Sequence, residues 1–273
     1  MSPQGIRLST SSSEDTSHDL VTRLDRLPVD SIGNDIARGK VAGAVNFVAF
    51  GERTHVGAQT DKVIWSNGDF NGPASGGVQM SIVSTSVNDT STGTGLRSIE
   101  LHYLDSDLKD KVEIVVLNGT TPVLTQSTDI HFINLFHVVT FGAGKAAAGD
   151  IIASNNGVTY AEIITGGLVQ TSTARMIPAN KKLYVAGATA GTVSLTAAAR
   201  VTIGIYSNTY NGLIFSDPFI LLPQLEIDLQ DNSIAFNFPV PSCFPAGSVV
   251  AMVSTNDKSC TVSGTIYGWT EDA

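Results

Sequence analysis

The acidic loop at residues 105–110 is the first candidate for chemistry, because its aspartates could bind calcium. It has the sequence Asp-Ser-Asp-Leu-Lys-Asp. A calcium loop needs several oxygen ligands and no cation among them, but Lys109 stands where the third ligand would fall, and neither a glycine nor a terminal glutamate follows. Asp and Ser are also ordinary hairpin residues. We therefore expect a plain turn here.

Three histidines, His102, His131 and His137, lie in stretches that have the pattern of strands. His131 and His137 are six positions apart, which puts them on one face of an unbroken strand but about 20 Å from each other. That separation is too large for one metal ion, and no cysteine or carboxylate cluster joins them in the sequence. We expect histidines that are satisfied within the fold or lie at an interface, and no metal ligands.

Catalytic and phosphate-binding motifs are not recognisable. Aligning the segment GAGKAAAGD with a phosphate loop puts Val139 where the first glycine belongs and Ala146 where the hydroxyl belongs, so the template fails. There is no G-x-S-x-G and no H-E-x-x-H. A Ser-His-Asp triad is set by geometry that a sequence does not show. We predict no enzymatic activity, no catalytic residues and no cofactor.

A set of aromatic residues suggests an alternative function, which is carbohydrate binding. These side chains could form a platform on which a sugar stacks, or they could fill a core or an interface. They are Tyr206, Tyr210, Phe215, Tyr267 and Trp269. The first possibility would give a protein that binds a receptor or carbohydrate.

The hairpin that carries the acidic loop must position the residues around it. Runs of β-branched and apolar residues between turn residues predict antiparallel strands across residues 78–141. A register with Leu104 opposite Lys111 puts His102 opposite Glu113 and makes one face wholly apolar. The other face would then be a half-polar strip suited to solvent or a subunit contact. Its residues would be Glu100, His102, Glu113 and Val115.

Composition narrows the class of protein. The chain has 273 residues, of which 42% are hydrophobic and only 15% are charged, with a net charge of −9. So few charges suit wide contacts with other subunits, since little charge must be desolvated. The negative balance without a basic stripe argues against nucleic-acid binding. We see no export signal, and the apolar runs are too short to span a bilayer, so we expect no membrane partner.

The first 40 residues differ from the rest and predict an extended N-terminal arm. Residues 19–27 have the pattern of a two-turn amphipathic helix, too short to be stable alone. Its apolar stripe consists of Leu20, Leu24 and Leu27. The stripe either packs on its own domain or lies on a neighbouring subunit.

After the arm, regularly spaced strands with Gly, Asn and Pro at the turns predict an all-β protein. We expect two antiparallel β-sandwich or jelly-roll-like domains, residues 41–177 and 178–273, with residues 1–40 as the arm. Cys243 and Cys260 would be two free, buried thiols, too far apart to bridge.

Several motifs resemble a family of structural proteins in the virions of tailed bacteriophages. The resemblance runs patchily from residue 41 to 273. It is carried by the Asp-Thr-Ser-Thr-Gly-Thr-Gly turn at residues 89–95, by Leu104-Asp105, by Leu-Asn-Gly-Thr-Thr at 117–121, and by the closing segment VSTNDKSCTVSGTIYGWTED. It implies a virion component, assembled in the host cytoplasm, without catalytic residues.

Combined with the low charge, this resemblance suggests a capsid decoration, or cement, protein. Such a protein would stabilise the phage head by contacts across capsomers. Its partners would be itself, with a trimer favoured, and the major capsid protein or other virion proteins. The alternative that the resemblance leaves open is a tail, neck or fibre-associated protein with receptor or carbohydrate binding.

Overall fold

The computed structural model describes residues 32–195, 197–210, 213–214 and 222–273. The predicted helix at residues 19–27, with Leu20, Leu24 and Leu27, lies outside this range, as does Phe215. Within it the chain is all-β and its strands pair antiparallel, as predicted, and its helical element is the short α2 (Ile32–Ala37). No helix in these residues is long and apolar enough to cross a membrane.

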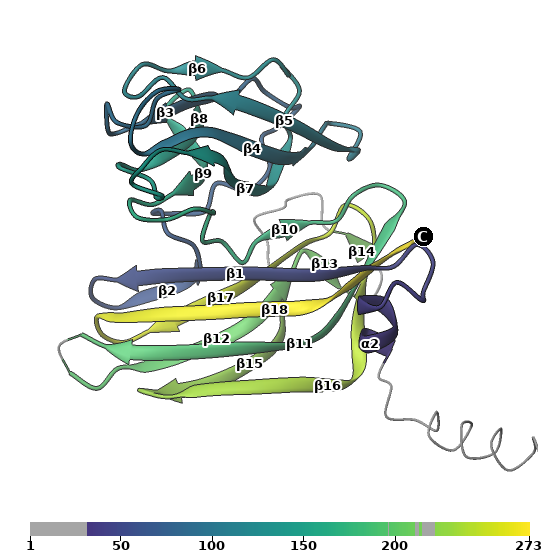
Figure 1. The fold of residues 1–273 in the computed structure, drawn as a ribbon. Helices are drawn as coiled ribbons and strands as arrows, with labels where there is room; N and C mark the ends of the chain where they lie inside the picture. The colour runs from purple at the N-terminus through teal and green to yellow at the C-terminus, as the bar shows by residue number, and fades with distance from the viewer. Residues whose placement is uncertain (1–31, 196, 211–212, 215–221) are drawn as a thin grey trace, which may run out of the picture.

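The strands form two units, one above the other in Figure 1. We call the part built on α2, β1, β2 and β10–β18 the lower unit, and the part built on β3–β9 the upper unit. The lower unit contains one sheet in the order β1-β18-β11-β16 and another in the order β10-β17-β12-β15, to which β2 adds by pairing with β17. Buried side chains from both sheets, among them Val185, Ile203 and Val262, make one core between them.

The lower-unit strands have the following bounds: β1 Val45–His55, β2 Gln59–Val63, β10 Arg175–Met176, β11 Lys181–Ser194, β12 Arg200–Ser207, β13 Thr209–Tyr210, β14 Leu213–Ile214, β15 Leu222–Gln230, β16 Ser233–Phe244, β17 Val249–Asn256 and β18 Cys260–Asp272. β13 and β14 form a separate two-stranded hairpin.

The predicted assignment of residues 41–63 to the first domain is wrong. β1 pairs with β18 over its whole length, from Val45 opposite Thr270 to His55 opposite Cys260, and β2 pairs with β17. The upper unit is therefore an insertion between β2 and β10, and two jelly rolls in tandem do not form. Local patterning identifies strands but not a pairing between segments far apart in the sequence, and sequential domains were the simpler assumption.

The upper unit has a four-stranded sheet in the order β6-β3-β8-β9 and a three-stranded sheet in the order β5-β4-β7. Its core lies between them and includes Met80, Leu101 and Phe136. The strand bounds are β3 Ser81–Ser84, β4 Leu96–Leu104, β5 Asp110–Val116, β6 Val123–Leu124, β7 Phe132–Phe141, β8 Ile151–Asn155 and β9 Val158–Ile163.

The register of the β4–β5 hairpin differs from the prediction by one residue. Leu104 pairs with Asp110, not Lys111. The acidic loop closes earlier than expected because the Asp105 carboxylate accepts hydrogen bonds from the backbone N–H of Asp107 at 3.0 Å and of Lys109 at 2.9 Å. Leu108 completes the turn in a left-handed conformation, with φ of 61°. This side-chain closure of the loop sets the register of the strands that follow.

The one-residue shift changes which residues share the outer face of the sheet. Glu113 and Val115 were predicted there, but Val115 is buried and Glu113 turns to accept hydrogen bonds from the backbone N–H of Gln126 and Ser127. The side chains that β5 presents on the outer face are Val112, Ile114 and Val116, each more than half exposed. The outer strip is therefore more apolar than the sequence suggested.

Both cysteines are free, as predicted, but only Cys260 is buried. Cys243 is exposed because its side chain lies on the face of β16 opposite to that of Phe244, which is buried in the core. The prediction of two buried thiols is wrong for Cys243.

Candidate functional site

Three polar side chains meet on the outer face of the β5-β4-β7 sheet. Glu100 on β4 lies directly opposite His137 on β7, and His102 follows on the same face of β4. One carboxylate oxygen of Glu100 lies 2.6 Å from Nε2 of His102 and 3.2 Å from Nε2 of His137. The two imidazole rings stack with their centroids 5.5 Å apart. The sheet thus holds a carboxylate and two imidazoles in mutual contact.

The surroundings define which atom of His137 carries a proton. Its Nδ1 lies 2.9 Å from the carbonyl oxygen of Val138. A carbonyl only accepts, so Nδ1 must be the donor, and in the neutral ring Nε2 then has a lone pair. That lone pair points at the Glu100 carboxylate, which is also an acceptor. The contact requires a proton or another cation between the two groups.

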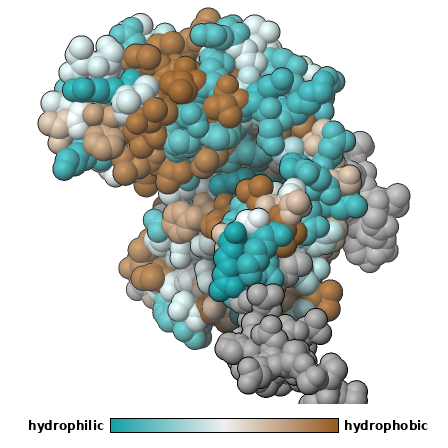
Figure 2. All heavy atoms as spheres, turned by 45° about the vertical axis from the view of Figure 1, so that its right-hand side comes forward, coloured by the Kyte–Doolittle hydropathy of each residue, from teal (hydrophilic) through white to brown (hydrophobic). Residues whose placement is uncertain are grey.

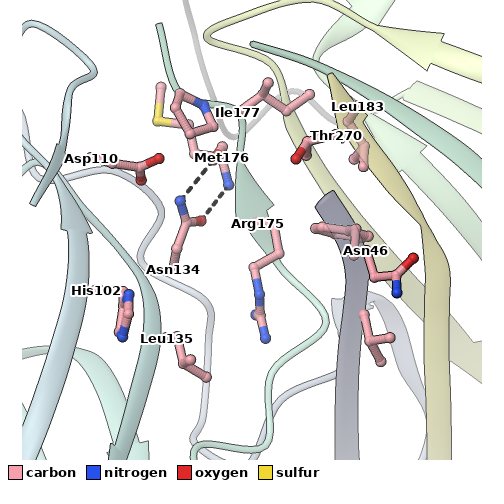
Figure 3. Close-up of a pocket in the computed structure, with 13 residues that line it drawn as sticks. Asn46, His102, Asp110, Asn134, Leu135, Arg175, Met176, Ile177, Leu183 and Thr270 are labelled. Carbon is pink, nitrogen blue, oxygen red and sulfur yellow. Dashed lines mark hydrogen bonds between the residues drawn. The ribbon is translucent and has the colours of Figure 1, made fainter. Parts of the chain in front are cut away.

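A cleft of about 320 Å³ lies next to this cluster, between the two units. Figure 3 shows His102, Leu135 and Asp110 on its upper-unit side and Asn46, Leu183 and Thr270 on the lower-unit side. Burial raises the pKa of the Asp110 carboxyl, and the nearby charges of His102 and Lys181 act against this effect. The cleft is therefore lined by polar groups from both units.

Arg175 on β10 is the cation inside this cleft. Its side chain is buried, and Nη1 donates to the carbonyl oxygens of Ser172 at 2.9 Å and Ala174 at 2.7 Å. Burial lowers the pKa of the guanidinium to about 10. Within the described residues it forms no ion pair with a carboxylate, so backbone carbonyls alone compensate its charge.

Asn134 joins the two units at the cleft. Its side-chain amide donates to the carbonyl oxygen of Met176 and accepts from the N–H of Met176, both at 2.9 Å, as drawn in Figure 3. Behind it, a cluster of apolar residues contains Leu104 and Phe132 from the upper unit and Met176 and Tyr206 from the lower unit. The two units therefore share a small apolar contact in addition to this pair of hydrogen bonds.

We expect Asn134→Ala to loosen this junction. Two buried backbone groups of Met176 lose their partners, which costs about 1 to 3 kcal/mol locally, so amide exchange of Met176 should accelerate about tenfold to a hundredfold. Hydrogen exchange read by NMR measures this. Asn155→Ala, which removes one bond to the carbonyl of Gln79 inside the upper unit, should leave Met176 unchanged; equal acceleration in both variants would contradict the assignment.

The structure brings together only some of the residues that the sequence singled out. Glu100 and His102 are in contact, whereas Glu113 faces elsewhere and Nδ1 of His131 bonds to the carbonyl of Ala74 at 2.7 Å. His137 was missed as a partner of Glu100, and Arg175 was not singled out at all. His137 could have been found from its position opposite Glu100, but that position is known only once the β4–β7 register is known. No local sequence feature indicates a role for Arg175.

The aromatic set does not form one platform. Tyr206 is buried in the cluster between the units, and Trp269 lies in the other sheet, where it is also buried and stacks on Tyr184. Trp269 and Tyr267 do line a second cavity of about 600 Å³, together with Phe47 and Phe238. Tyr210 and Phe215 carry no described side chain.

Among the described residues, His55 and Ser254 form a serine–histidine pair. Nε2 of His55 lies 2.9 Å from the Ser254 hydroxyl, but both side chains are buried and Nδ1 of His55 has no hydrogen-bond partner. A catalytic pair needs an accessible hydroxyl and a group that orients the imidazole. This pair has neither.

Comparison with known proteins adds little. No protein-family model matches the sequence, and a search of curated proteins finds no match. A chain from a structure of infectious bursal disease virus, Gt strain, is similar with a TM-score of 0.23 and 10% sequence identity, over 84% of this chain and 73% of that chain. A likeness this weak carries no argument about fold or function.

Proposed function

We propose that this chain is a non-enzymatic structural protein of a virion that works by packing against further copies of itself and against other shell proteins. The observation that carries the proposal is the apolar strip on β5. Val112, Ile114 and Val116 are 55%, 53% and 55% exposed in a row on one face of an edge strand. Figure 2 shows apolar side chains gathered over the upper unit.

Exposure of such an apolar strip to water is unfavourable in free energy. Burying a half-exposed branched aliphatic side chain contributes about 1 kcal/mol, and several in a row on an edge strand favour association with another chain. Glu100 and His102 lie beside the strip on β4, which gives it the polar margin that protein interfaces have. The second copy is the occupant we favour, because only 15% of the residues are charged and the strip needs no oppositely charged partner.

More specifically, we propose a capsid decoration protein of a tailed bacteriophage, acting as a trimer. Support for this finer assignment comes from the turn motifs described above and from the low charge. A decoration protein stabilises a shell by adding buried contact across the joints between capsomers, so stability follows from mass action without covalent chemistry. Local three-fold axes of a capsid lattice suit trimers. Copy number in the purified virion tests this role: hundreds of copies agree with decoration, whereas about a dozen place the chain in the tail or neck.

We expect Ile114→Lys to abolish self-association of the purified chain. A charge in the middle of the strip would have to be desolvated on contact, which should weaken association at least a hundredfold. Sedimentation velocity measures the oligomeric state over a range of concentrations. Val87→Lys, at an exposed position outside β5, is the matched control and should associate as the parent chain does. A parent chain that is monomeric at high concentration would refute assembly through this strip.

A further inference from the structure

We propose that Glu100, His102 and His137 bind a divalent transition-metal ion of the zinc type on the outer face of the β5-β4-β7 sheet. The ligand atoms are Nε2 of each histidine and a carboxylate oxygen of Glu100. These atoms all lie within 4.8 Å of one another. The proposal is independent of the assembly role, since it concerns the isolated chain.

The distances fit a metal centre. Ligand atoms about 2.0–2.1 Å from a tetrahedral zinc ion are about 3.3 Å apart. The distance of 3.2 Å between Glu100 and His137 already has this value, and the 2.6 Å contact between Glu100 and His102 needs to open by a side-chain rotation. The backbone is fixed by the pairing of β4 with β7, so the site is built on rigid elements.

The tautomer of His137 supports the same conclusion. Metal-binding histidines commonly donate their other ring N–H to a carbonyl or carboxylate, which orients the ring and leaves the ligating nitrogen unprotonated. The bond from Nδ1 of His137 to the carbonyl of Val138 has this role. In the neutral ring the lone pair of Nε2 then faces a carboxylate oxygen of Glu100, and a metal ion between these two atoms would satisfy both.

The ionic contacts of Glu100 and the solvent exposure of the three side chains also favour a metal ion. Among the described residues, no lysine or arginine pairs with Glu100, whose ionic contacts are His102 and His137 alone. The side chains of His102, His137 and Glu100 are 38%, 30% and 22% exposed, so an ion can enter and keep open coordination positions.

Two imidazoles and one carboxylate select the class of ion. Calcium and magnesium prefer oxygen ligands, whereas imidazole nitrogen suits zinc, cobalt, nickel and iron. Three protein ligands leave at least one position for water or for a group from another molecule. The site is distinct from the cleft around Arg175, although His102 contributes to both.

The test is titration of the EDTA-treated full chain with ZnCl2 by calorimetry, and with CoCl2 by visible absorption. We expect one ion per chain with micromolar or tighter affinity, weaker in acid because protons compete for the imidazoles. Glu100→Gln, His102→Gln and His137→Gln should each weaken binding at least tenfold. His131→Gln, at a histidine that is bonded to Ala74 and lies apart from the cluster, should bind as the parent chain does.

A second measurement needs no substitution in the cluster. Paramagnetic Co²⁺ should broaden the imidazole resonances of His102 and His137 in the parent chain and leave those of His55 and His131 sharp. Absence of stoichiometric binding would overturn the proposal. So would binding that broadens other histidines, or binding that survives unchanged in folded variants at all three ligands. In that case Glu100 and the two histidines are a hydrogen-bonded network only.

Discussion

Replacing Asp89 with asparagine should destabilise the upper unit by about 2 to 5 kcal/mol, because it disrupts a buried carboxylate that accepts four hydrogen bonds. Asp89 is 0% exposed. Its Oδ1 accepts from the backbone N–H of Leu96 at 2.7 Å and of Ala148 at 3.0 Å; its Oδ2 accepts from the Ser84 hydroxyl at 2.6 Å and from the N–H of Gly149 at 3.0 Å. The side-chain amide of an asparagine at this position would place its own N–H donors opposite the N–H and O–H groups that now donate to Asp89.

These four bonds hold together parts of the chain that are distant in sequence. Ser84 ends β3, Leu96 begins β4, and Ala148–Gly149 is the loop that precedes β8. Asp89 therefore joins strands of both upper-unit sheets. Gly95 makes the geometry possible, since a Cβ there would come within 2.1 Å of Oδ1 of Asp89. The aspartate and the last glycine of the 89–95 turn are thus required by one local structure.

Urea unfolding followed by near-ultraviolet circular dichroism measures the loss for Asp89→Asn. Asp150→Asn is the matched control, because Asp150 accepts two bonds, both from Thr165, in a more exposed position. The control should cost about 1 kcal/mol or less. If Asp89→Asn stays within about 0.5 kcal/mol of the parent chain, the carboxylate does not stabilise the unit as described.

The same turn illustrates how far the sequence predicts the fold. Glycines and threonines at residues 89–95 identified a turn, and alternating apolar residues identified β4 and β5 as strands, because both signals are local. The register of β4 with β5 was missed by one residue, because it depends on the side-chain bonds of Asp105 inside the loop. A strand pattern shows which residues alternate but not where a loop closes.

Contacts between distant segments could not be predicted from the sequence. The pairing of β1 with β18 joins segments that are far apart in the sequence, and neither strand has a feature that identifies its partner. The candidate site shows the same limit at a smaller scale. Glu100 and His102 are two residues apart and could be grouped by strand alternation, but His137 joins them only through the β4–β7 register. His131, which the sequence suggests as a strand neighbour of His137, precedes β7 and bonds to Ala74 instead.

Folding stability should fall as the pH drops from about 6.5 to about 4, because of His55. The ring is 1% exposed, and burial, with smaller effects from Arg53 and Lys62, lowers its pKa to about 4. In the unfolded chain a histidine has a pKa of about 6.5. Between these two pKa values His55 binds a proton in the unfolded chain but not in the folded protein. The free energy of unfolding is therefore highest above pH 6.5 and falls progressively as the pH drops towards 4. Each pH unit in this window costs about 1.4 kcal/mol, giving at most about 3 kcal/mol.

The difference between the parent chain and His55→Gln isolates this effect, because the carboxylates that also titrate in acid are common to both. We expect the parent chain to be the more stable at pH 7, since His55 packs in its native contacts with Ser254. Its advantage should shrink steadily towards pH 4.5 and can reverse there, because glutamine takes up no proton. Ser254→Ala keeps the buried imidazole and should retain the pH dependence of the parent chain. A parent-minus-variant difference that is constant from pH 7 to pH 4.5 would show that His55 is protonated as readily in the folded protein as in the unfolded chain.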